Sequence, residues 1–197
     1  MKTNSEIRQD AKLAMSGNWG DGIVLTIVYG LISGSAGALQ AIVPAASLIF
    51  VVLPLGFGVI LAYLRFTREG VLNVKNMFNV FSSTYYLKSI AVGLLTGIYT
   101  LLWSLLLIVP GIIKAMSYAL AQYVMADNSS LSAEQAICQS MKMMEGHKMD
   151  LFLMVLGYVA LAFLSAFLLG IPMLWLTPYY STVFAKFYEE VKAEHAM

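Results

Sequence analysis

Charged side chains are scarce in this sequence, and three long stretches have almost none. Only 12% of the 197 residues are charged and 59% are hydrophobic, against about 25% and about 45–50% in soluble domains. No Asp, Glu, Lys or Arg occurs from Gly22 to Leu64 or from Leu151 to Ala185, and residues 89–126 contain only Lys114. A globule of this length cannot bury so much apolar surface, so the composition predicts an integral membrane protein.

Other scarcities exclude several kinds of site. The single cysteine, Cys138, cannot form an internal disulfide or a multi-thiolate metal site, and two distant histidines do not make a metal site, so we expect no metal or other cofactor. The net charge of +1 argues against a nucleic-acid partner. We find no nucleophile with a base, no paired carboxylates within the apolar stretches and no glycine-rich phosphate loop. The sequence therefore predicts that the protein is not an enzyme.

The lengths of the uncharged stretches predict the fold class. A transmembrane helix needs about 20 residues, so each stretch fits two crossings joined by a short turn. We predict an all-α, polytopic membrane protein with six transmembrane helices in one membrane domain (residues 1–197). The three helical hairpins are expected at about residues 22–64, 89–126 and 151–186.

Glycine and proline indicate where these hairpins turn. Ser33–Gly37 and Pro44 predict a return near residues 36–46, Pro110-Gly111 predicts the second turn, and Gly170 to Pro172 predict the third. The last helix is expected to run past Pro178 and to leave the membrane near Lys186.

The distribution of lysine and arginine predicts the orientation. Eleven of the twelve lie in connectors on one side of the proposed membrane, at residues 1–21, 65–88, 127–150 and 186–197. Positive residues mark the cytoplasmic face, so both termini are expected in the cytoplasm.

A short amphipathic helix is expected before each hairpin, at about residues 4–16, 73–82 and 132–145. Thr3 with Glu6, and Ser132 with Gln135, have the spacing of capping boxes. In the second helix the predicted apolar face consists of Val74, Met77, Phe78 and Phe81. We expect all three helices to lie flat on the cytoplasmic leaflet with their apolar faces among the lipid headgroups.

Three cations are candidates for a functional role. Lys114 is the only ionisable residue within an apolar stretch, so it either serves a site for an anionic solute or extends to the outer headgroups. His147 and Lys148 could bind a phosphate at the membrane surface, or they could simply favour the end of the preceding helix.

Other polar residues have simpler interpretations. Arg65 and Arg68 end the second span and are expected to contact phospholipid headgroups or Glu69. Asp127 is interpreted as the start of a polar connector. Gly93 and Gly97 form a G-x-x-x-G pattern that can seat a close helix contact, either within the chain or with a second copy.

Several motifs resemble one family. They are the run from Trp103 to Ile112, the stretch from Ser140 to Lys148, and Pro178-Tyr179 followed by Phe187-Tyr188. The combination resembles the bacterial integral membrane family catalogued as domain of unknown function 975. That family is distantly similar to the membrane domain of some bacterial glycerophosphodiester phosphodiesterases. The resemblance implies a lipid or envelope context in the bacterial cytoplasmic membrane and supplies no catalytic residues.

Three functions are consistent with these observations. The first is a non-enzymatic membrane protein that works with envelope lipids as a scaffold, sensor or lipid-handling helper. The second is a small-solute transporter or channel that uses Lys114, and the third is a self-protection protein against membrane-active peptides. The expected partners are membrane lipids, and a second copy or another membrane protein is a further possibility.

Overall fold

The described part of the chain is entirely helical. The computed structural model describes residues 2–39, 46–82 and 84–195. Within these ranges there are nine α-helices, one π-helical segment and one 3₁₀ helix, and there is no strand. In chain order the elements are α1 (Asn4–Met15), α2 (Trp19–Leu39), the π-helical η1 (Leu48–Val52), α3 (Leu53–Glu69), the 3₁₀ helix η2 (Val74–Phe81), α4 (Tyr86–Leu106), α5 (Ile108–Tyr118), α6 (Ala121–Asp127), α7 (Ala133–Met143), α8 (Lys148–Ala166) and α9 (Met173–His195).

Five helical stretches of the described residues are long and apolar enough to cross a membrane. They are Trp19–Ala38, Leu48–Glu69, Tyr86–Leu106, Ile108–Asp127 and Lys148–Ala166. Five such stretches indicate a multi-pass membrane protein. The remaining long helix, α9, does not belong to this set, because its second half is rich in charged residues from Lys186 onward.

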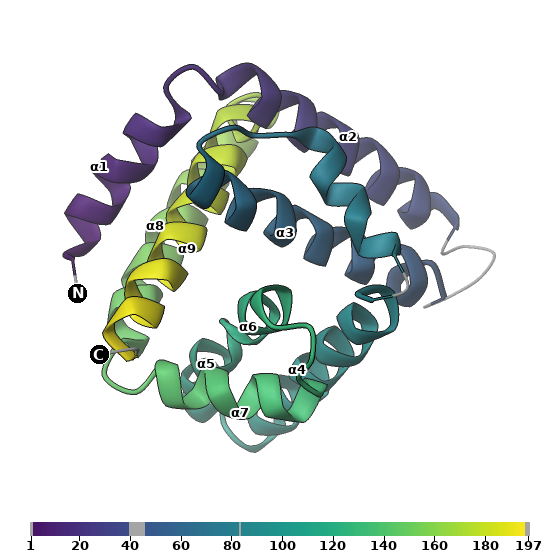
Figure 1. Cartoon of the computed structure of the whole chain (residues 1–197), viewed down its shortest axis with the longest axis vertical. Helices are drawn as coiled ribbons and strands as arrows, with labels where there is room; N and C mark the ends of the chain where they lie inside the picture. Colours follow the sequence, from purple (N-terminus) through teal and green to yellow (C-terminus); the bar gives the residue numbers. More distant parts are fainter. Residues whose placement is uncertain (1, 40–45, 83, 196–197) are drawn as a thin grey trace.

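Helix α9 makes contacts with helices from both ends of the chain. It packs against α1, α2, α3, α7 and α8. Figure 1 shows α8 and α9 side by side along the left of the view, with α1 next to them. Helices α2 and α3 run from the upper part of α9 toward the right, and α4 to α7 occupy the lower part (Figure 1). The long helices therefore run in different directions, and α2 packs against α9 (Figure 1).

The capping boxes of α1 and α7 form as predicted. The Thr3 hydroxyl oxygen accepts a hydrogen bond from the Glu6 N–H, and the Glu6 carboxylate accepts one from the Thr3 N–H at 2.7 Å. Ser132 and Gln135 make the same reciprocal pair. These bonds satisfy N–H groups that have no partner inside the helix. Each helix is followed by a glycine with positive φ, Gly17 after α1 and Gly146 after α7.

The apolar faces of α1 and α7 lie against protein, which corrects the prediction that they lie among headgroups. In α1, the side chains of Ile7, Ala11 and Met15 are completely buried and face α9. In α7, Ala136 and Ile137 are buried, and the helix packs against α4, α5 and α6. A narrow apolar face fits a groove between neighbouring helices as well as it fits a lipid surface, and here neighbouring helices cover it.

The second short helix differs from its prediction in type and in the face that it buries. Residues 74–81 form a 3₁₀ helix, so side chains three positions apart share a face. Met77 and Val80 are completely buried, whereas Phe78 and Phe81 are 43% and 45% exposed. Gly58 of α3 lies beneath η2, and an added Cβ there would overlap the carbonyl oxygen of Met77. Protein contacts therefore hold this segment, and its predicted α-helical face is wrong.

The serine- and glycine-rich segment of the predicted first return (residues 36–46) is helical as far as Leu39, and residues 40–45 lie outside the described residues. Helix α2 continues through Ser33–Gly37 to Leu39. The hydroxyls of Ser33 and Ser35 each donate to the carbonyl four residues earlier, at 2.7 and 2.8 Å, so the helix satisfies these polar groups itself. Pro44 lies outside the described residues.

The other two turns lie near their predicted positions. The second turn is at Leu107, which is extended (φ −160, ψ 144) and separates α4 from α5. Pro110 falls in the first turn of α5, where its missing N–H costs nothing, so the turn precedes it instead of including it. The third turn contains Leu169 and Gly170, both with positive φ. Helix α9 continues past Pro178, as predicted.

The parts of the second and third hairpins nearest their turns expose apolar side chains on every side. Leu105 and Ile108 beside the second turn are 74% and 76% exposed, and Leu169 in the third is 91% exposed. Toward the other end of these hairpins, Val92 and Met154 are completely buried. Each hairpin therefore has a protein-covered base and a bare apolar end, as expected of segments that lipid surrounds.

Candidate functional site

The candidate residues from the sequence do not gather in one site. Arg65 and Arg68 lie near the end of α3, Lys114 lies in α5, and His147 and Lys148 lie at the start of α8. The Arg65 guanidinium donates to the Asn76 side-chain oxygen at 3.3 Å, which ties α3 to η2. Each of the others has its own surroundings.

Arg68 belongs to a cluster of polar side chains from three helices. Its Nη2 lies 2.7 Å from Asp127 Oδ1 and 2.7 Å from Glu189 Oε1. The second oxygen of Asp127 accepts hydrogen bonds from the Tyr188 hydroxyl at 3.0 Å and from the Lys192 ammonium. These five residues are called the three-hairpin cluster below, because α3, α6 and α9 each belong to a different one of the three predicted hairpins. Arg68 therefore pairs within the protein with Asp127 and Glu189, and not with Glu69 as one of the two predicted alternatives had it.

Asp127 ends α6 and leads into the connector, as predicted, and it is also the centre of this cluster. Its side chain is only 15% exposed, and both of its oxygens have cationic partners. The ring of Tyr188 also stacks on the ring of Tyr123, with 5.5 Å between the centroids, and this contact helps to position the Tyr188 hydroxyl. A carboxylate with two cations and a hydroxyl around it is well satisfied, so the cluster is suited to joining helices.

Lys114 contacts an aromatic ring instead of a charged partner. Its Nζ lies 4.9 Å from the centroid of the Trp103 ring. This distance is within the range of a cation–π interaction. Both side chains belong to the second hairpin, and Lys114 lines neither of the grooves described below.

His147 lies close to the C-terminal end of α9. Its Nε2 is 3.7 Å from Glu194 Oε1, and its ring centroid is 6.2 Å from that of His195. Lys148 is the next residue in the chain, and its side chain lines a groove between α5 and α8. The two neighbours therefore do not combine into a single phosphate site.

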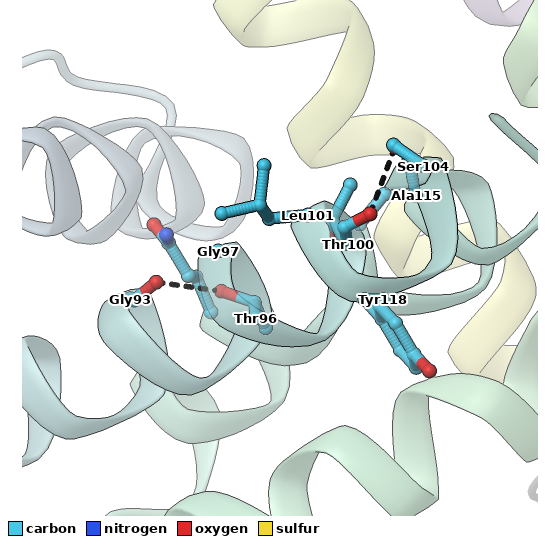
Figure 2. Close-up of a pocket in the computed structure, with 10 residues that line it drawn as sticks. Gly93, Thr96, Gly97, Thr100, Leu101, Ser104, Ala115 and Tyr118 are labelled. Atoms are coloured by element: carbon cyan, nitrogen blue, oxygen red, sulfur yellow. Dashed lines mark hydrogen bonds between the residues drawn. The ribbon is translucent and has the colours of Figure 1, made fainter. Parts of the chain in front are cut away.

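A groove with small and hydroxyl-bearing side chains lies between α4 and the α5–α6 segment (Figure 2), with a volume of about 480 Å³. It is lined by Gly93, Thr96, Gly97, Thr100, Leu101, Ser104, Ala115, Tyr118, Ala119 and Gln122. The Thr96 hydroxyl donates to the Gly93 carbonyl at 3.0 Å, and the Ser104 hydroxyl donates to the Thr100 carbonyl at 2.8 Å (Figure 2). These hydroxyl protons are therefore already used by α4 itself. The groove carries no formal charge.

The glycine pair in α4 makes one close contact within the chain. A Cβ added at Gly93 would lie 3.3 Å from the Leu53 side chain of α3, whereas one at Gly97 would meet nothing within 4 Å. Gly93 therefore seats the first hairpin against the second, and Gly97 opens onto the groove.

A second groove lies between α5 and α8 and is almost wholly apolar, with a volume of about 390 Å³. It is lined by Val109, Ile112, Ile113, Met116, Lys148, Met149 and Phe152. The one charged group is the Lys148 ammonium. An apolar channel beside a single cation has the chemistry of a site for an amphiphile with an anionic head.

The N-terminal helix is held to α9 by a separate group of charges. The Lys2 ammonium donates to Asp10 Oδ2 at 2.8 Å and lies 3.1 Å from Glu190 Oε1. The hydrogen bond from Lys2 lowers the pKa of Asp10 below its ordinary value, and hydrogen bonds to Asp10 and Glu190 raise the pKa of Lys2. Both groups are therefore charged at neutral pH, and the Asp10 carboxylate is already engaged.

The sequence contained weak signals for the residues that were missed. Asp127 directly follows an uncharged stretch, and Tyr188 and Lys192 are four residues apart on α9, so they share a helix face. Thr96, Thr100 and Ser104 repeat every four residues along α4. Each pattern indicates a shared face, and none of them identifies the partner helix.

The comparisons with known proteins identify the family. Across the described residues, no three His, Cys, Asp or Glu side chains lie together as metal ligands would. Neither the search of curated proteins nor the search of solved structures gave a match. A family model described as protein of unknown function (DUF975) matches residues 1–121 and 105–195, which is nearly the whole chain. The chain therefore belongs to the DUF975 family.

Proposed function

We propose that this protein is a non-enzymatic lipid-handling scaffold of the bacterial cytoplasmic membrane. The observation that carries the proposal is the groove between α5 and α8, which joins an apolar lining to one ammonium group at Lys148. Its volume of about 390 Å³ lies within the range of about 300–1,000 Å³ found for small-molecule sites. An acyl chain fits the lining, and a lipid phosphate fits the ammonium. Membrane lipids are therefore the proposed partners.

We further propose that three hairpins enter the membrane from the cytoplasmic side and give six spans. The bare apolar ends of the hairpins and the position of nearly all lysine and arginine residues in the connectors support this topology. In this topology the sixth crossing consists of the uncharged first part of α9 together with the turn before it, and the charged half of α9, from Lys186, lies in the cytoplasm together with the N-terminus.

Cys138 provides a test of this orientation. It is the one cysteine of the sequence, and its side chain is exposed on α7. We expect a membrane-impermeant maleimide to label it in opened vesicles and to leave it unlabelled in intact cells. A Cys138→Ser variant is the control for background labelling. Strong labelling in intact cells would overturn the cytoplasmic placement of α7 and of both termini.

Filling the groove tests the lipid-handling proposal. Met116→Trp places a larger side chain in the groove, so we expect the affinity of the delipidated protein for a pyrene-labelled anionic phospholipid to fall roughly tenfold, equivalent to about 1.4 kcal/mol. Leu102→Trp is the matched control, because Leu102 is 54% exposed on the same hairpin and does not line the groove. Equal affinities for the two variants would show that this groove is not where lipid binds.

A further inference from the structure

A pocket of about 580 Å³ lies where α1, the start of α2 and α9 meet. It is separate from both grooves described above. Its lining combines two cations, two polar side chains and two aromatic side chains, namely Arg8, Lys12, Gln9, Ser16, Trp19 and Tyr179. It contains no carboxylate. It is called the α1 pocket below.

The two cations of the α1 pocket have no carboxylate partner among the described residues. On the same helix, Lys2 takes the carboxylate of Asp10 and approaches that of Glu190. Arg8 and Lys12 form no ion pair. The pocket therefore has two positive charges that the described part of the protein leaves uncompensated.

The Arg8 side chain is also partly buried. Its Nε is buried and has no hydrogen-bond partner. Its guanidinium extends toward α8, where a Cβ added at Gly157 would lie 3.1 Å from Nη2. The Tyr179 hydroxyl donates to the Arg8 backbone carbonyl at 3.3 Å, so this contact does not involve the guanidinium. A buried guanidinium donor without an acceptor is costly, so this site favours an anionic ligand with several acceptor oxygens.

Helix α2, which begins at the pocket, has an exposed apolar face. Trp19 begins both the helix and a candidate membrane span. Val24, Ile27 and Leu31 then follow at helical spacing and are all exposed. Tryptophan and tyrosine favour the level of the lipid headgroups. The pocket therefore lies at the headgroup end of an exposed apolar helix face.

From these observations we propose that the α1 pocket binds the phosphate of an anionic phospholipid. The Arg8 guanidinium and the Lys12 ammonium hold the phosphate oxygens, and the acyl chains lie along the exposed face of α2. The inference rests on the proposed role with membrane lipids and adds a second lipid site, one that selects lipids by their charge. The α5–α8 groove remains a distinct site with its own test.

The pocket contains a natural reporter, because Trp19 is one of its walls. In a Trp103→Phe, Trp175→Phe background, Trp19 is the only tryptophan of the full-length chain. We expect phosphatidylglycerol with brominated acyl chains to quench its fluorescence at a lower lipid concentration than brominated phosphatidylcholine does. Arg8→Met removes the guanidinium and keeps an apolar stem, so the phosphatidylglycerol concentration at half-quenching should rise roughly tenfold. Arg8→Lys should recover part of this loss.

Lys75→Met is the matched control, because it removes an exposed cation that does not line the pocket and should leave quenching unchanged. The proposal is overturned if both brominated lipids quench alike, or if Arg8→Met and Lys75→Met behave alike. It is also overturned if inorganic phosphate displaces the lipid at equal concentration, since free phosphate is then the ligand. Pyrene-lipid binding in the α5–α8 groove should stay unchanged in Arg8→Met. The pyrene-lipid test uses Met116→Trp and the quenching test keeps Met116, so the two measurements are independent and distinguish failure of one site from failure of the other.

Discussion

Gly58→Ala is expected to cost about 3 kcal/mol of folding stability, because α3 and η2 meet backbone to backbone at this position. The added Cβ would overlap the Met77 carbonyl oxygen and lie 3.0 Å from the Met77 carbonyl carbon and 3.2 Å from a Val80 methyl group. The backbone atoms cannot rotate aside as a flexible side chain would. Unfolding by sodium dodecyl sulfate, followed by circular dichroism in mixed micelles, measures this loss.

Gly56→Ala is the matched control two residues away in the same helix. Its added Cβ would meet only the Tyr29 hydroxyl, at 3.9 Å, so the contact is ordinary. Alanine is a better helix former than glycine by about 1 kcal/mol, so this variant should be neutral or slightly more stable. If both variants lost the same stability, close packing of η2 on α3 would not be the cause.

Asp127→Asn should destabilise the protein by about 2–3 kcal/mol. Asparagine keeps the size of the side chain but removes the charge that Arg68 and Lys192 share. Arg68 retains Glu189, whereas Lys192 loses its carboxylate, so α6 should separate from α9 first. The same unfolding titration measures the overall loss, and hydrogen exchange of residues 121–127 reports the local loosening.

The control for this variant is Glu69→Gln, which removes an exposed carboxylate next to Arg68 in the sequence. Surface substitutions of this kind usually change stability by less than about 0.5 kcal/mol. A loss at Glu69 as large as the loss at Asp127 would mean that Arg68 pairs with its neighbour, as the sequence suggests, and would contradict the three-hairpin cluster.

The features that could be predicted from the sequence depend on residues close together in the chain. Helix starts at Thr3–Glu6 and Ser132–Gln135 are local hydrogen-bond patterns, so three-residue spacing is enough to find them. The uncharged stretches likewise predict long apolar helices, because hydrophobic length is a local property. The position of Pro110 relative to the second turn was harder to predict, because proline breaks a helix in its interior but is tolerated in its first turn.

The features that could not be predicted depend on contacts between distant segments. Asp127 lies about 60 residues from both Arg68 and Glu189 along the chain, Arg68 and Glu189 are 121 residues apart, and nothing in their local sequence identifies them as partners. The 3₁₀ form of η2 depends on Gly58, which admits its backbone. In the same way, Arg8 stands in an ordinary amphipathic helix, and its uncompensated charge emerges only once α8 and α9 surround it.

The absence of charge from the second and third hairpin turns has a consequence for membrane insertion. Neither the second turn at Leu107 nor residues 167–172 of the third contains a charged side chain. Each charge moved to the centre of the bilayer costs about 2.5–3.5 kcal/mol on the insertion scale, and the membrane potential acts only on charge. In the proposed topology, the passage of these turns through hydrocarbon therefore requires no electrical work. Insertion of the third hairpin should proceed equally well in energised and de-energised membranes, while the second hairpin moves only the ammonium of Lys114.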